Sequence, residues 1–93
     1  MAYSLYQIDN VIKGDSGGMS LAISVKDDGS YETEHDARPR AGVYMRVGSL
    51  YARSYVAQDW WQTNLVTELL EEKNDYVKFR TKSGSVYEWK VIN

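Results

Sequence analysis

The chain has 93 residues, of which 43% are hydrophobic and 26% charged, with a formal net charge of −2 and no cysteine. A chain of this length can bury one hydrophobic core but not two lobes around a deep cleft, so we expect a single compact domain over residues 1–93. The lack of cysteine excludes disulfide scaffolds, thiolate metal sites and thiol nucleophiles, and the near-neutral charge argues against a general duplex-DNA binder.

The N-terminal residues show neither the basic start nor the apolar stretch of a signal peptide. No segment approaches the ~18–20 apolar residues that a membrane span needs. We therefore expect a cytoplasmic protein that relies on packing alone for its stability.

The first half of the chain predicts a hairpin followed by a third strand. Residues 19–25 alternate strictly, with Met, Leu, Ile and Val pointing one way and Ser, Ala and Ser the other, which is the pattern of a half-buried strand. Asp28-Gly29 is a strong hairpin signal, because glycine accepts the positive φ of the turn, and residues 30–35 form the returning arm. Residues 36–42 contain the only proline and predict a loop, and residues 43–47 predict a strand.

The second half predicts another hairpin, in which residues 76–81 and 85–92 are strands joined by Lys-Ser-Gly. Residues 65–73 fit either a helix or a strand. We favour the strand because it completes a three-stranded meander with short connections. Residues 3–12 are similarly mixed, and residues 48–55 either continue the third strand after a bulge or turn away from it.

These elements predict a mainly β fold. It is either a small single-domain antiparallel sheet or an SH3-like or OB-like barrel, with one short helix as an α+β variant.

Residues 14–18, Gly-Asp-Ser-Gly-Gly, resemble the pentapeptide around the nucleophile of chymotrypsin-like serine proteases. That family places its histidine and aspartate upstream of the serine, whereas here only fifteen residues precede Ser16 and the single histidine, His35, lies downstream. Because glycine, aspartate and serine are also common in turns, we interpret the segment as a loop.

An acidic cluster surrounds the single histidine, at Glu32, Glu34, His35 and Asp36. On a strand the two glutamates share one face while His35 points to the other, so the cluster is a poor cation site and fits a solvated hairpin arm better. The remaining candidates for acid–base chemistry are Glu68, Glu71 and Glu72, which are more simply exposed residues. We therefore expect no catalytic residue, no metal and no cofactor.

The charge is divided between two neighbouring segments. Residues 26–36 carry a net charge of −4, and residues 37–61 carry +3, with four of the five arginines in the chain. The second segment also holds five aromatic residues, and arginine, tyrosine and tryptophan are enriched at binding hot spots. If Trp60 and Trp61 lie on a strand, one faces outward and the other is buried, as Trp89 also is.

The predicted binding residues are Arg38, Arg40, Arg46, Tyr51, Arg53, Tyr55, Trp60 and Trp61. The predicted acidic surface comprises Asp27, Asp28, Glu32, Glu34 and Asp36.

This pattern predicts a non-enzymatic protein-interaction or inhibitor module that docks on another protein. Small proteins of this size and style are common among phage and mobile-element products that inhibit host machinery, including anti-CRISPR and other anti-defence proteins. The alternative is a small β-barrel that binds single-stranded nucleic acid or a nucleotide, since arginine with stacked aromatics suits that ligand too. A homodimer through a β-rich edge is also compatible with the sequence.

Overall fold

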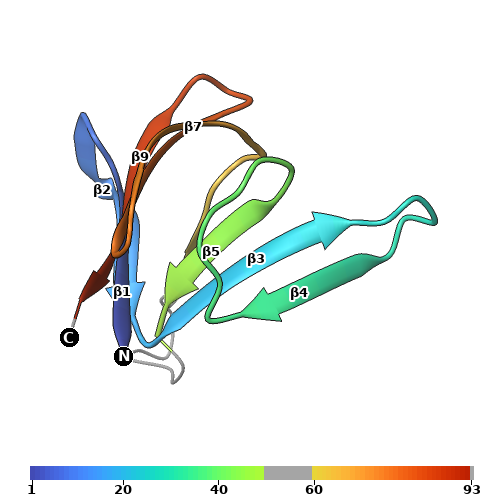
Figure 1. Cartoon of the computed structure of the whole chain (residues 1–93), viewed down its shortest axis with the longest axis horizontal. Coiled ribbons are helices and arrows are strands. Elements are labelled where there is room, and N and C mark those ends of the chain that lie inside the picture. Colours follow the sequence, from blue (N-terminus) through green and yellow to red (C-terminus); the bar gives the residue numbers. More distant parts are fainter. Residues whose placement is uncertain (50–59, 93) are drawn as a thin grey trace.

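In the computed structural model, which describes residues 1–49 and 60–92, the chain forms two antiparallel sheets (Figure 1). The strands are β1 Ala2–Gln7, β2 Asn10–Gly17, β3 Met19–Val25, β4 Tyr31–His35, β5 Tyr44–Gly48, β6 Trp60–Gln62, β7 Val66–Lys73, β8 Tyr76–Thr81 and β9 Val86–Ile92. The first sheet has the order β2-β1-β9-β8-β7 and the second β4-β3-β5-β6. The mainly β prediction is confirmed. The described residues contain no helix, and so none that could cross a membrane.

Both predicted hairpins are confirmed. Between β3 and β4, Gly29 has a φ of 86° and Lys26 donates its N–H to the carbonyl of Ser30 at 2.8 Å. Between β8 and β9, Gly84 has a φ of 91°. The β3–β4 hairpin extends away from the rest of the molecule (Figure 1).

The segment over residues 65–73 is a strand, as favoured from the sequence. It forms β7, which pairs with β8 and completes the meander β7-β8-β9. The mixed N-terminal segment forms two strands, β1 and β2, with a turn at Ile8 and Asp9. Because β1 also pairs with β9, the first and last strands of the chain lie side by side.

The core lies between the two sheets. Its largest members come from β8 and β9, where Val77 and Phe79 share one buried face with Tyr87 and Trp89. The second sheet contributes Ala22, Met45 and Val47, and the N-terminal strand Tyr3 and Leu5.

One buried hydroxyl links the two sheets. Ser20 on β3 accepts a hydrogen bond from Trp89 Nε1 at 2.9 Å and donates to the carbonyl of Ala37 at 2.7 Å. Ser20 is 1% exposed, so these bonds satisfy polar groups that water does not reach.

Strand β3 directs its small side chains, not its large apolar ones, toward this core. Ser20 and Ala22 are each 1% exposed and face the first sheet, whereas Leu21 and Ile23 lie outside the core cluster. Trp89 on β9 reaches Ser20 through its ring nitrogen, and small side chains leave room for such a large residue opposite them. The apolar face of β3 is therefore turned away from the body of the protein.

The expectation of a loop over Gly14–Gly18 is wrong, because Gly14–Gly17 belong to β2. These glycines are needed for close packing and not for a turn. A Cβ at Gly14 would lie 2.1 Å from the carbonyl oxygen of Leu5, and one at Gly17 would lie 2.2 Å from that of Gly48. Glycine in a strand often marks such a close approach of backbones.

Candidate functional site

The outer face of the second sheet is the candidate site. Because side chains alternate along a strand, the outward residues of β3 share this face with those of the paired strands. The ladder places Leu21 between His35 and Arg46, and Ile23 between Thr33 and Tyr44. Leu21 and Ile23 are each 8% exposed, so their neighbours on this face cover them.

An arginine stacks on a tryptophan between β5 and the edge strand β6 of this face. The guanidinium carbon of Arg46 on β5 lies 4.0 Å from the centre of the Trp60 ring on β6. Gln62 Oε1 holds the guanidinium from the side and accepts bonds from Nε at 3.0 Å and Nη2 at 2.6 Å. Such cation–π stacks form when the positive group lies over the face of the ring. The arrangement gives the surface a flat, charged platform with a defined orientation.

Two hollows lie along the second sheet, and Arg46 lines the larger of them. The larger has a volume of about 380 Å³ and is lined by Ile23, Tyr31, Thr33, Arg46 and Gln62. The smaller, of about 130 Å³, lies at the start of β3 between Met19, Leu21 and His35. Apolar walls with a few fixed polar groups are the usual make-up of binding sites.

The predicted binding residues do not form one patch. Of these, Arg46 and Trp60 lie together on the outer face. Trp61 points the other way, as alternation predicts for neighbouring residues, packs against the core and donates its Nε1 to the Tyr87 hydroxyl at 3.1 Å. Tyr51, Arg53 and Tyr55 lie outside the described residues.

Arg38 holds two parts of the fold together. Its guanidinium donates to the carbonyls of Lys73 and Asn74 at 2.5 and 3.0 Å and lies 3.2 Å from a carboxylate oxygen of Glu72. It also lies 5.9 Å from the centre of the Trp89 ring. These contacts tie the loop after β4 to the turn between β7 and β8.

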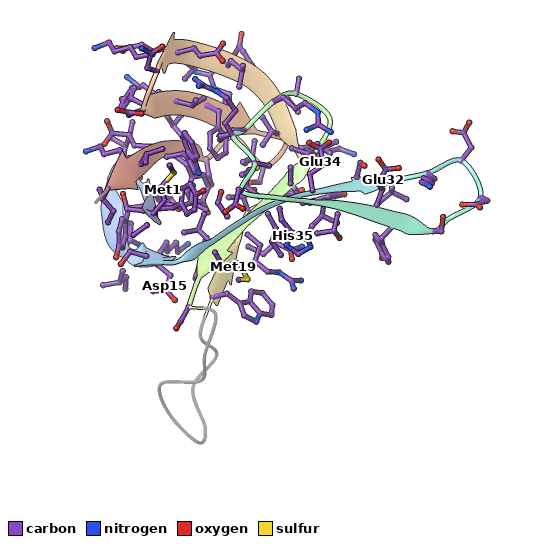
Figure 2. All side chains as sticks on the ribbon, turned by 60° about the horizontal axis from the view of Figure 1, so that its bottom comes forward. Met1, Asp15, Met19, Glu32, Glu34 and His35 are labelled. Atoms are coloured by element: carbon purple, nitrogen blue, oxygen red, sulfur yellow. The ribbon has the colours of Figure 1, made fainter. Side chains whose placement is uncertain are left out.

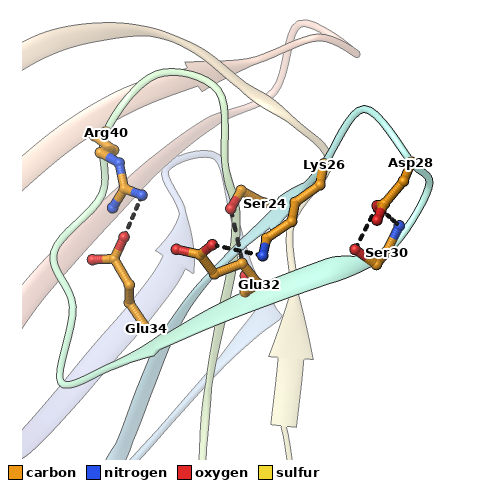
Figure 3. A network of polar contacts seen from close by, with 7 residues as sticks. All are labelled: Ser24, Lys26, Asp28, Ser30, Glu32, Glu34 and Arg40. Carbon is orange, nitrogen blue, oxygen red and sulfur yellow. Dashed lines mark hydrogen bonds and ion pairs between the residues drawn. The ribbon is translucent and has the colours of Figure 1, made fainter.

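Arg40 and the predicted acidic residues Glu32 and Glu34 make polar contacts on the opposite face of the hairpin (Figure 3). Arg40 pairs with Glu34, and Lys26 Nζ lies 3.3 Å from Glu32 Oε2. Figure 2 shows Glu32 and Glu34 on one side of the β3–β4 ribbon and His35 with Met19 on the other.

The three predicted aspartates lie in different surroundings. Asp28 accepts bonds from the hydroxyl and the N–H of Ser30, and these bonds lower the pKa of its carboxyl. Asp27 lies in the same exposed turn. Asp36 accepts a bond from the Tyr3 hydroxyl at 3.0 Å, and burial together with this bond raises the pKa of that tyrosine.

The other candidate carboxylates lie in ion pairs, and the protease-like pentapeptide lies largely in a strand. Glu68 pairs with Arg80, and Glu71 lies 3.0 Å from Lys73. Ser16 lies within β2 opposite Ser4, and its N–H bonds to the Asp15 carboxylate at 2.7 Å. No group of three or more histidine, aspartate or glutamate side chains in the described part of the chain could hold a metal ion.

A larger hollow, of about 530 Å³, opens on the outer face of the first sheet. Its cationic lining residues are Lys78 and Arg80, and its apolar ones include Ile8 and Leu70. Since Arg80 already pairs with Glu68, this hollow offers a ligand a partly neutralised wall.

Comparison with protein-family models, with curated proteins and with solved structures finds no match to this chain.

Proposed function

We propose that this protein is a non-enzymatic binding module that docks on another protein through the outer face of its second sheet. The observation that supports this proposal is the Arg46–Trp60 stack beside the 380 Å³ hollow. Arginine and tryptophan in a well-packed setting are the residue types that carry most of the energy at protein interfaces.

The composition of this face favours a protein partner over a nucleic acid. Arg46 is accompanied by tyrosine, threonine, glutamine and aliphatic side chains, while Lys26 and Arg40 lie on the opposite face of the hairpin. A groove for single-stranded nucleic acid needs several cations along the backbone path as well as stacking rings. Binding of a single strand or a nucleotide is therefore the second candidate, supported by the stack alone.

An inhibitor is the specific form of the proposal that we favour. A small module that offers a binding face and no catalytic group acts by occupying a surface that its partner needs. Its size and style fit a phage or mobile-element product of the anti-defence type, including an anti-CRISPR protein, and such a role places it in the cytoplasm.

The proposal is tested by capture of partners from a cell lysate on the immobilised protein. Arg46→Ala and Trp60→Ala should each reduce capture of a specific protein by about tenfold or more, as expected for hot-spot residues. Arg80→Ala is the matched control, because it removes an ion-paired arginine from the outer face of the first sheet, and it should leave capture within about twofold.

A titration with a short single-stranded oligonucleotide at two salt concentrations separates the second candidate. Affinity that falls steeply with salt and is lost in Arg46→Ala indicates nucleic-acid binding, because each neutralised phosphate releases counterions. Capture that is the same in Arg46→Ala, Trp60→Ala and Arg80→Ala would contradict docking through this face.

A further inference from the structure

We propose that β4 is a docking edge that accepts an extended segment of the partner as an additional antiparallel strand, and that this segment carries lysine or arginine at alternate positions. The inference rests on the proposed function, since it specifies how part of the same partner is held.

The backbone of β4 has hydrogen-bonding groups that point away from the sheet. Along an antiparallel pair, bonded and non-bonded residue pairs alternate. Lys26 donates its backbone N–H to the carbonyl of Ser30, which lies directly opposite it. Because the bonded pairs recur at every second residue, the pairs Ser24–Glu32 and Ala22–Glu34 are bonded as well. The backbone N–H and C=O groups of Tyr31, Thr33 and His35 therefore face outward, where no described strand lies.

The other sheet edges are less suited to pairing. The register of β7 against β8 shifts twice, and that of β2 against β1 shifts once. Such irregularities protect an edge from incoming strands. The edge strand β6 is only three residues long, whereas β4 pairs with β3 over five residues without a shift. All five residues of β4 are exposed.

The charge on one face of β4 determines which strand it can accept. Glu32 and Glu34 keep 56% and 47% of their side-chain surface exposed although each has a cationic partner. Residues 26–36 carry a net charge of −4. Opposite charges directly across a strand pair are stabilising, so basic residues at alternate positions of the incoming segment complement this face.

The same charges disfavour a second copy of this chain. In an antiparallel pair of two copies, the residues whose backbone groups face outward must lie opposite each other. If Thr33 lies opposite Thr33 of the copy, Glu32 lies opposite Glu34 of the copy. If the register shifts by two residues, Glu32 lies opposite Glu32 of the copy, or Glu34 opposite Glu34. Like charges directly across a strand pair are destabilising, so β4 selects a basic strand over its own copy.

The other face of β4 continues the Arg46–Trp60 face. Tyr31 and Thr33 line the 380 Å³ hollow together with Ile23. Apolar residues between the basic ones of the incoming segment would therefore lie next to the proposed docking face, which makes the edge and the face one continuous site.

The test is a titration of the isotopically labelled full chain, followed by nuclear magnetic resonance, with two synthetic peptides of equal length and blocked ends. One peptide alternates lysine with valine and the other alternates glutamate with valine. We expect the lysine peptide to shift the amide signals of Tyr31, Thr33 and His35 and to bind at least about tenfold more tightly than the glutamate peptide.

Two sets of variants make the test specific. Thr33→Pro removes one outward N–H at an edge position where proline is tolerated, and it should weaken lysine-peptide binding about tenfold, whereas Thr33→Val should stay within about twofold. The double variant Glu32→Gln and Glu34→Gln should bring the affinities of the two peptides within about twofold of each other. This second result does not depend on how Thr33→Pro folds.

Equal binding of the two peptides by the unaltered protein, or binding of neither, would overturn the proposal. If the lysine peptide fails while Arg46→Ala still abolishes partner capture, the edge proposal is wrong and the proposed function stands. If the peptide binds as expected but Arg46→Ala and Trp60→Ala leave capture unchanged, the proposed docking face is wrong.

Discussion

Arg46 and Trp60 are diagonal neighbours on β5 and β6, with the guanidinium carbon 4.0 Å from the centre of the indole ring. The stack lies on the side of the sheet that faces away from the core, and Gln62 fixes the guanidinium from the neighbouring strand. The protein therefore orders two large side chains outside its core.

Replacing Arg46 should separate binding from stability. A cation–π contact at an exposed site contributes about 0.5–1 kcal/mol, so Arg46→Ala should lower the free energy of unfolding by no more than about 1 kcal/mol. The same variant should lose partner capture. Urea unfolding followed by tryptophan fluorescence measures the first effect, and a loss of several kcal/mol would show that the stack is mainly structural.

Ser20 should be important for stability although it is a small polar residue. Ser20→Ala leaves Trp89 Nε1 and the carbonyl of Ala37 without their partner inside the protein, so we expect a loss of about 2–4 kcal/mol. Ser24→Ala is the matched control on the same strand, because its hydroxyl is exposed and bonds at 3.5 Å. It should change stability by less than about 0.5 kcal/mol. Equal effects in urea unfolding would contradict a bridging role of Ser20.

Gly17 should not tolerate a side chain. A Cβ there would lie 2.2 Å from the carbonyl oxygen of Gly48, so Gly17→Ala should cost about 1–3 kcal/mol of stability through overpacking. Its neighbour Ser16 provides the control, since Ser16→Ala should cost no more than about 0.5 kcal/mol. A stability loss in Ser16→Ala as large as that in Gly17→Ala would contradict the close-packing role of Gly17. A hydrolytic activity that Ser16→Ala removes would support a role for the protease-like pentapeptide.

Stability should fall at alkaline pH in a way that depends on Tyr76. Burial and the hydrogen bond to Glu88 raise the pKa of Tyr76 from 10.0 to about 12. The unfolded chain therefore releases this proton at a lower pH than the folded chain. The stabilisation is complete below pH 10.0 and is lost as the pH rises toward about 12.

Tyr76→Phe should make this alkaline decline shallower. Part of the decline should remain, because the pKa of Tyr3 is raised as well. The measurement is the urea midpoint of both proteins across the alkaline range. Identical declines would show that Tyr76 is not responsible.

The strands and turns could be predicted from the sequence because their signals are local. Asp28-Gly29 and Ser83-Gly84 mark the two hairpins, and the strands predicted over 76–81 and 85–92 form β8 and β9. Glycines 14 and 17 misled the prediction, because a glycine required by a neighbouring backbone looks the same in sequence as one required by a turn.

The candidate site could be predicted only in part, because its formation depends on partners distant in sequence. Arginine and aromatic content indicated residues 38–61, but sequence could not show that Arg38 is held by backbone carbonyls of Lys73 and Asn74. The apolar face of β3 was the signal that was missed. Leu21 and Ile23 look like core residues, and only the burial of Ser20 and Ala22 toward the first sheet shows that they face outward.

Hydroxyl-radical footprinting of the captured complex tests the docking face most directly, because it needs no substitution. Reactive side chains lie on both sides of the molecule, with Tyr31 and Trp60 on the outer face of the second sheet and Tyr6 and Tyr76 on the first sheet. We predict that partner binding lowers the oxidation of Tyr31 and Trp60 and leaves Tyr6 and Tyr76 unchanged. Protection of Tyr6 and Tyr76 with unchanged oxidation of Trp60 would contradict docking through the second sheet.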